Sequence, residues 1–175
     1  MPRRTLLRAA TLLLAAALAG CAGYRWVGDA DGALPVHGGT ARLAVPPVIN
    51  DTAEPLLSER ITSTLRSRLI AGGVNVGMGG EPRLVGRVVR FADDVLAFGA
   101  DGRASHRRIV LTASVRLERG GKAEWEAPAM VSSAVYTVSG DATINRDNKD
   151  RAVAEAALGL SEQILLALGT LEAAP

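Results

Sequence analysis

The sequence is poor in cysteine and aromatic residues, and each shortage excludes a class of protein. A single cysteine in 175 residues cannot form an internal disulfide or supply a multi-cysteine zinc site. Aromatic residues make up 3% of the chain, too few for a surface on which nucleic-acid bases stack. With 48% hydrophobic residues and 20 Lys+Arg against 18 Asp+Glu, the chain is neither a charged disordered protein nor a basic nucleic-acid-binding tail. Length and composition predict one folded domain.

The first twenty residues have the layout of a secretory signal. Arg3, Arg4 and Arg8 precede an apolar stretch and a group of small residues. That stretch is shorter than the roughly 20 residues needed to cross a bilayer, and no later segment reaches this length without charge. Leu18-Ala19-Gly20-Cys21 resembles the bacterial lipobox, which implies cleavage before Cys21 and covalent lipid on its sulfur. The alternative is an ordinary secretory cleavage that leaves a free thiol.

Removal of this signal changes the charge of the chain. Cys21–Pro175 contains 17 Lys+Arg and 18 Asp+Glu, a net charge of −1, so the basic character belongs to the signal. Ala22 stands where an Asp would retain an enteric lipoprotein at the inner membrane, and this resemblance favours export to the periplasmic leaflet of the outer membrane. Ala22–Thr40 is rich in glycine and lacks a hydrophobic period, as in a flexible tether. We expect a signal over residues 1–20, a lipidated N-terminus and tether over 21–40, and one domain over 41–175.

Two amphipathic helices are predicted after the tether. Leu57, Ile61, Leu65 and Leu69 recur every four residues. Before them, Asn50-Asp51-Thr52 offers side chains that can cap a helix, and Pro55 suits a first helical position. Gly72-Gly73 follows this stretch and predicts its end. A second periodic stretch, with apolar residues three and four apart, begins near Lys149 and runs to the C-terminal part of the chain.

Short strands are predicted around and between the helices. Alternation of apolar and polar residues is clearest over Ile109–Leu117, and Asp101-Gly102 and Gly120-Gly121 predict hairpin turns on either side. The element order predicts an α+β, two-layer sandwich, with two amphipathic helices packed on one face of a mixed four- to five-stranded sheet. The other predicted strands cover residues 42–45, 74–76, 84–91 and 122–138, the last interrupted near Pro128.

No catalytic or metal-binding pattern is present in the sequence. His37 and His106 have no recognisable partners. Asp93 and Asp94 are adjacent, so on a strand they point to opposite faces and cannot share a metal or a proton. The sequence therefore predicts a protein that is not an enzyme, with no metal and no cofactor other than the lipid on Cys21.

Arginine is concentrated in one stretch. Residues 83–119 contain eight Arg against four acidic residues. If Asp101-Gly102 forms a two-residue turn, Arg87 faces Arg116 across the hairpin, and like charges placed this way repel unless an anion joins them. Guanidinium groups suit bidentate recognition of phosphate. We hypothesise that Arg87, Arg108 and Arg116 bind an anion; a bulge that shifts the register, or neutralisation by acidic side chains, is the alternative.

Six segments of the chain together carry a family resemblance: Cys21–Arg25, Leu34-Pro35, Leu43–Leu56, Leu84–Val88, Val115–Leu117 and Lys122–Glu126. They resemble the LptE family, the outer-membrane lipoproteins of lipopolysaccharide (LPS) assembly. The resemblance implies a non-catalytic partner that enters and plugs an LptD-like β-barrel translocon, aids barrel assembly and contacts LPS, with a lipid anchor on the membrane and no nucleic acid bound. The arginine face would then meet phosphates of lipid A or acidic groups inside the barrel.

A second function remains open at this point. Lipoproteins that regulate a cell-wall synthase, and curli-secretion-like lipoproteins, can also begin with a short strand, a polar loop and an amphipathic helix. The expected partner distinguishes the two functions. An LptE-like protein would bind a β-barrel, whereas a cell-wall regulator would bind a peptidoglycan synthase.

Overall fold

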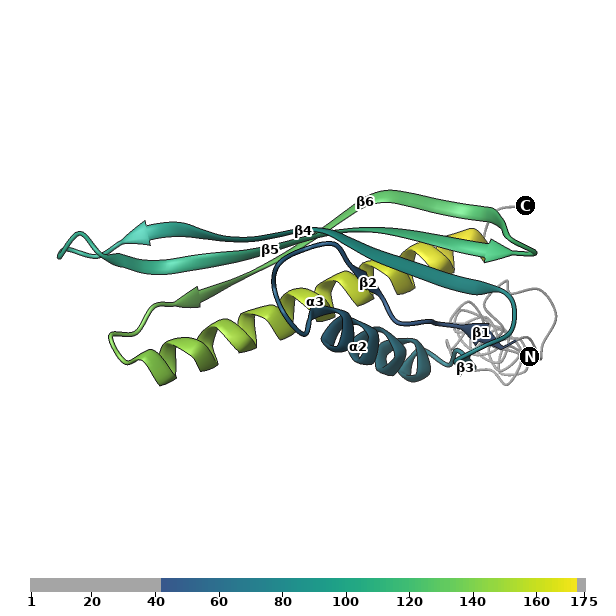
Figure 1. Ribbon diagram of the computed structural model, residues 1–175, viewed down its shortest axis with the longest axis horizontal. Helices are drawn as coiled ribbons and strands as arrows, with labels where there is room; N and C mark the ends of the chain where they lie inside the picture. The colour runs from purple at the N-terminus through teal and green to yellow at the C-terminus, as the bar shows by residue number, and fades with distance from the viewer. Residues whose placement is uncertain (1–41, 173–175) are drawn as a thin grey trace, which may run out of the picture. The chain divides into compact units, whose positions relative to one another are not determined.

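The computed structural model describes residues 42–172, so the predicted signal, Cys21 and the tether lie outside the described residues. Two helices and six strands follow one another in the order β1, β2, α2, β3, β4, β5, β6, α3 (Figure 1). Their bounds are β1 Leu43–Ala44, β2 Ile49–Asn50, α2 Leu57–Ala71, β3 Val76–Gly77, β4 Arg83–Phe98, β5 Ala104–Arg119, β6 Lys122–Thr137 and α3 Ala142–Glu172.

The six strands form one mixed sheet in which three long antiparallel strands dominate. The order is β3-β1-β4-β5-β6, and β2 pairs with β4 beside β1. The short strands β1 and β2 run parallel to β4, whereas β4, β5 and β6 form an antiparallel meander. Gly120 and Gly121 close the second hairpin with positive φ angles of 56° and 74°, as a tight turn between strands requires. The predicted α+β class and mixed sheet are confirmed, with six strands instead of four or five.

Both helices cover the same face of this sheet (Figure 1). The predicted stripe of α2 is buried, since Leu57, Ile61, Leu65 and Leu69 are at most 1% exposed. Alternate residues of β5 complete the core from the sheet side, as the 2.0-residue period of a strand requires. These core residues of β5 are Ile109, Leu111, Ala113, Val115 and Leu117.

Helix α3 is longer than the sequence analysis predicted, because it begins at Ala142 and not near Lys149. The Asp141 carboxylate accepts hydrogen bonds from the backbone N–H groups of Thr143 and Ile144 at 2.7 and 3.2 Å, which caps the first turn. This is the one described helix long and apolar enough to cross a bilayer. Its apolar character is that of a core helix, because Val153, Leu160 and other members of its stripe pack against the sheet.

The start of α2 also differs from the prediction. The helix begins at Leu57, and its N-cap residue Leu56 has a left-handed φ of 61° with no side-chain cap. Asn50 instead organises the loop before the helix: its Oδ1 accepts from the N–H of Thr52 at 3.0 Å, and its Nδ2 donates to the Glu54 carbonyl at 2.9 Å. The polar residues expected to cap the helix therefore form a turn, a common alternative use of Asn side chains.

A polar row on α2 holds the proline-containing segment between β1 and β2. The Thr62 Oγ1 accepts from the buried N–H of Val48 at 2.8 Å, and the Ser58 Oγ donates to the Val48 carbonyl at 2.6 Å. One turn further on, the Arg66 Nε and Nη2 both donate to the Val45 carbonyl, at 3.0 and 2.6 Å. Because Pro46 and Pro47 cannot donate to a sheet ladder, these side chains supply the hydrogen bonds that the sheet does not.

Candidate functional site

The candidate anion-binding residues lie on the sheet face that neither helix covers. We call this the helix-free face. Arg87, Arg108 and Arg116 all point to it, because the alternate positions on their strands face the core. The residues of β4, β5 and β6 that share this face form cross-strand rows. The rows are Asp94–Arg108–Val135, Ala92–Val110–Ser133, Arg90–Thr112–Val131, Arg87–Ser114, Val85–Arg116–Glu126 and Arg83–Glu118–Ala123.

The predicted direct pairing of Arg87 with Arg116 is wrong. Arg87 lies opposite Ser114, and Arg116 lies opposite Val85. The loop that connects the strands spans residues 99–103, and the ladder shifts register between Val88 and Arg90 and twice more near the turn. Arg87 and Arg116 are nevertheless diagonal neighbours on one face, a separation that long side chains bridge.

The structure brings Arg87 and Arg116 together but separates them from Arg108. Arg108 and Arg116 are eight residues apart on β5, which corresponds to about 27 Å along an extended strand. One small anion therefore cannot contact both. Arg90 joins the Arg87–Arg116 end of the face from the next row, and the sequence analysis did not single it out.

Acidic side chains accompany these arginines. The Arg87 Nη1 donates to the Asp51 Oδ2 at 2.6 Å, and the Arg116 Nη2 lies 3.5 Å from the Glu118 Oε1. Arg108 lies opposite Asp94. The side chains of the Arg87–Asp51 and Arg116–Glu118 pairs are partly exposed, and surface ion pairs of this kind stabilise a fold by about 0–1 kcal/mol. They therefore leave the guanidinium groups accessible to a competing anion.

A second polar group lies on the opposite, helix-bearing face. The Arg107 Nε donates to the Asp93 Oδ1 at 2.8 Å, and the Tyr136 hydroxyl donates to both Asp93 carboxylate oxygens at 3.1 Å. Lys149 of α3 joins this cluster from the helix layer, with its Nζ 3.0 Å from the Glu54 Oε2 and 5.3 Å from the centre of the Phe91 ring.

Burial and hydrogen bonding perturb two titrating groups of this cluster. Desolvation by burial, followed by the charge of Asp93, raises the pKa of Tyr136. The hydrogen bond to Asp93 raises the pKa of Arg107, so this guanidinium stays charged. Every charged member has a partner, and the cluster ties β4, β5, β6, α3 and the loop before α2 to one another. We interpret it as a structural connection, because it lacks a nucleophile with a base.

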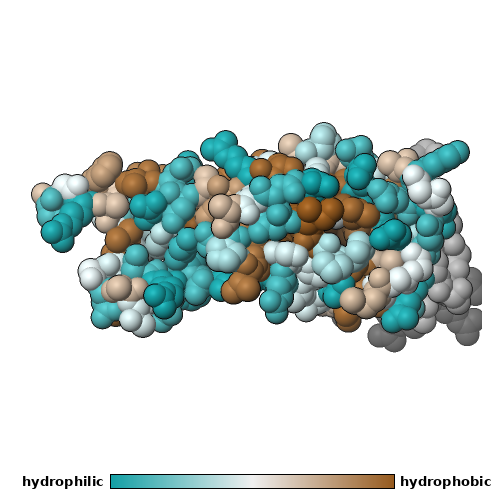
Figure 2. Space-filling view, in the orientation of Figure 1, coloured by the Kyte–Doolittle hydropathy of each residue, from teal (hydrophilic) through white to brown (hydrophobic). Residues whose placement is uncertain are grey.

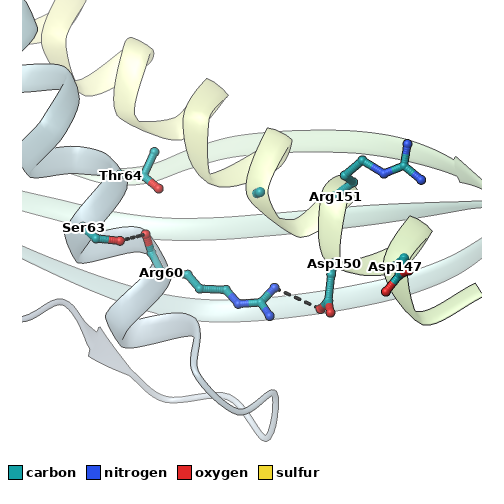
Figure 3. Close-up of a pocket in the computed structure, with 7 residues that line it drawn as sticks. Arg60, Ser63, Thr64, Asp147, Asp150 and Arg151 are labelled. Carbon is teal, nitrogen blue, oxygen red and sulfur yellow. Dashed lines mark hydrogen bonds and ion pairs between the residues drawn. The ribbon is translucent and has the colours of Figure 1, made fainter. Parts of the chain in front are cut away.

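A shallow hollow of about 470 Å³ lies between α2 and α3 (Figure 3). Arg60 and Ser63 line it from α2, and Asp147, Asp150 and Arg151 line it from α3. The Arg60 Nη1 donates to the Asp150 Oδ1 at 3.0 Å, so these two charges of the hollow pair with each other. Among residues 42–172, no group of three or more His, Cys, Asp or Glu residues is arranged to hold a metal ion.

Apolar side chains also remain on the surface. Figure 2 shows several hydrophobic groups separated by polar residues on the face in view. On the helix-free face, Val131 and Val135 are 53% and 48% exposed. At the β4–β5 hairpin, Leu96 and Phe98 are 49% and 69% exposed. The site therefore combines cationic and apolar surface, which suits binding of an amphipathic partner more than catalysis.

The fold is that of a two-layer α+β domain, and comparison with known proteins gives its family. The family model LptE, lipopolysaccharide-assembly, matches residues 40–168. The chain belongs to the LptE family, which confirms the resemblance seen in its sequence. Among curated proteins, no sequence match reaches significance.

Solved structures share the fold at low sequence identity. Rare lipoprotein B from Shewanella oneidensis is 15% identical, with a TM-score of 0.53 over 75% of this chain and 96% of that chain. A minor lipoprotein from Acinetobacter baumannii is 14% identical, with a TM-score of 0.53 over 75% and 92%. A protein from Caulobacter crescentus is 16% identical, with a TM-score of 0.54 over 73% and 92%. At these identities the likeness shows the fold alone.

Proposed function

We propose that this chain is a lipid-anchored, non-catalytic component of lipopolysaccharide assembly at the outer membrane, where it partners and plugs the LptD-like β-barrel translocon. The observation that carries the proposal is the family match over residues 40–168. In this proposal residues 1–20 are a signal, Cys21 carries the lipid in the periplasmic leaflet, and residues 21–40 tether the domain over 41–175. Several acyl chains on one cysteine suffice for stable anchoring, because each buried CH₂ contributes about 0.8 kcal/mol.

Purification of the tagged full-length chain from native envelopes tests the partner. We expect a large β-barrel protein to be recovered with it in similar amount. Recovery of an inner-membrane peptidoglycan synthase in place of the barrel would contradict the proposal and favour the cell-wall regulator. Mass spectrometry of the same material tests the anchor, since an unmodified Cys21 or a retained signal would contradict lipidation.

The helix-free face supports direct contact with LPS. We propose that Arg87 and Arg116 bind one phosphate of lipid A, and that Arg108, about 27 Å along the strand, contacts a separate acidic group. The exposed valines of the same face provide apolar surface beside these cations. An arginine–phosphate pair is a charge-assisted interaction, worth about 1.5–3 kcal/mol, or about tenfold or more in affinity.

Neutral substitutions test this contact. The double variant Arg87→Gln, Arg116→Gln should lose at least tenfold in affinity for purified LPS. The matched control, Arg146→Gln with Arg151→Gln, removes the same charge from exposed positions on α3 and should bind as the native chain does. Asp51→Asn should bind LPS more tightly, because it releases Arg87 from its ion pair. Equal binding by the double variant and the native chain would reject this site.

A further inference from the structure

The long strands of the sheet have two open edges, and these differ in how well they are protected against pairing. Among the described strands, none pairs with β6 on the side away from β5. None pairs with β4 beyond Val88 on the side of β4 that faces away from β5. The open part of β4 carries Arg90, Asp93 and Asp94, together with irregularities in its register. Charged residues and bulges are the usual means by which edge strands avoid pairing with other chains. The β4 edge is therefore protected.

The second half of β6 lacks these protections. Residues 130–137 contain no charged residue and no proline, and their pairing with β5 is uninterrupted from Met130 to Thr137. Charged residues, a proline and the register shifts are confined to the first half of the strand. Val131 and Val135, the two valines of the unprotected half, are 53% and 48% exposed.

The backbone geometry identifies which groups face the open side. The N–H of Val138 donates to the Ser105 carbonyl of the neighbouring chain segment at 2.9 Å, so even-numbered residues at this end of β6 direct their backbone groups toward β5. In an antiparallel ladder the intervening residues direct theirs away. The backbone groups of the odd-numbered residues therefore point out from the sheet. These residues are Val131, Ser133, Val135 and Thr137.

Side chains of α3 limit the open stretch at both ends. The Gln163 Nε2 donates to the Val131 carbonyl at 3.0 Å, and the Asn148 Nδ2 donates to the Thr137 carbonyl at 2.9 Å. Between them, the backbone groups of Ser133 and Val135 make no hydrogen bond to another described residue. The free backbone groups of Ser133 and Val135 are two residues apart, which is the spacing at which an added strand would form hydrogen bonds.

We propose that residues 130–137 are a β-augmentation site, at which an extended segment of the protein partner adds a seventh strand to the sheet. This inference rests on the proposed function, which supplies the partner. The occupant is an uncharged strand with β-branched or small residues on alternate positions. It must pack beside Val131 and Val135, and residues 130–137 offer no charge to pair with one of its own. Main-chain hydrogen bonds provide affinity in this mode of recognition.

Hydrogen exchange in the full-length chain, free and in the complex recovered with its barrel partner, tests the proposal. We expect the N–H groups of Ser133 and Val135 to exchange rapidly in the free chain and at least 100-fold more slowly in the complex. Ala134 and Tyr136, whose N–H groups face β5, are internal controls and should be protected in both states. Ser133→Pro removes one outward donor and should reduce recovery of the partner, whereas Ser133→Ala keeps the donor and should not.

The outcomes separate the two claims. If the barrel is recovered but Ser133 and Val135 exchange as rapidly as in the free chain, the augmentation site is wrong and the proposed function stands. Failure to recover the barrel overturns both. Protection in the free chain that rises with its concentration would show that a second copy occupies the edge, which also overturns the proposal.

Discussion

The hydroxyl of Thr62 makes the most specific prediction about what stabilises the fold. Thr62 is 5% exposed, and its Oγ1 accepts from the Val48 N–H at 2.8 Å while donating to the Ser58 carbonyl at 2.5 Å. Thr62→Val replaces the hydroxyl with a methyl group of similar size and preserves the β-branched shape. Val48, itself 3% exposed, would then keep a buried N–H without an acceptor.

The expected loss of stability follows from the buried Val48 N–H that has lost its acceptor. A buried polar group without a partner costs about 1–3 kcal/mol, and we expect Thr62→Val to lower the free energy of unfolding by this amount. Thr64→Val is the matched control, because Thr64 lies on the same helix, is half-buried and makes no described hydrogen bond through its side chain. It should change stability by at most about 0.5 kcal/mol. Equilibrium urea denaturation of the full-length chain measures both, and equal stability of the two variants would refute the assignment.

Two further predictions concern the contact between helix and sheet and the buried tyrosine. A Cβ on Gly159 would lie 2.7 Å from the Ser132 Oγ, so Gly159→Ala should destabilise the native chain. In the Ser132→Ala variant this clash is absent, and the same substitution should stabilise the fold by about 1 kcal/mol through helix propensity. Equal effects in both backgrounds would contradict this contact. Because the pKa of Tyr136 is raised in the folded chain, the unfolded chain releases the hydroxyl proton at lower pH than the folded chain does. The protonated Tyr136 therefore contributes fully to the free energy of unfolding below about pH 10, and this contribution is lost as the pH rises above that value. Tyr136→Phe should show a smaller fall in stability above pH 10, and an unchanged fall would refute the assignment.

Much of the fold followed from the sequence because its elements have strong local signals. The four-residue repeat of α2 and the alternation around Ile109–Leu117 each predict a buried face, and those faces are buried. Gly72 and Gly120-Gly121 mark the end of a helix and a turn, as predicted. These features depend on residues close together in the chain, so a short window of sequence contains the required information.

The errors arose where distant residues decide the outcome. Asn50 was expected to help cap a helix, but its side chain organises the preceding loop. The pairing of Arg87 with Arg116 failed because bulges change the register without a clear signal in the sequence. The partner of Arg87 is Asp51, which is 36 residues away. The Asp93–Arg107–Tyr136 cluster was likewise missed, since its members lie on three strands and only the completed sheet brings them together.

The helix-free face was predicted in outline and not in detail. The alternation over Ile109–Leu117 implies that Arg116, Ser114 and Thr112 lie on one side of the strand, and the structure has them there. The rise per residue along β5 separates Arg108 from Arg116 by about 27 Å. The three arginines therefore form two separate candidate sites, Arg87 with Arg116 and Arg108 by itself. The open edge of β6 has no sequence signal of its own, because an uncharged strand can be central or terminal in a sheet.

Depletion of the protein from its native host tests the central claim most directly. If this chain partners the translocon in LPS assembly, depletion should reduce the amount of LPS displayed on the cell surface and leave the barrel protein incompletely folded. Normal surface LPS together with a fully folded barrel after depletion would contradict the account.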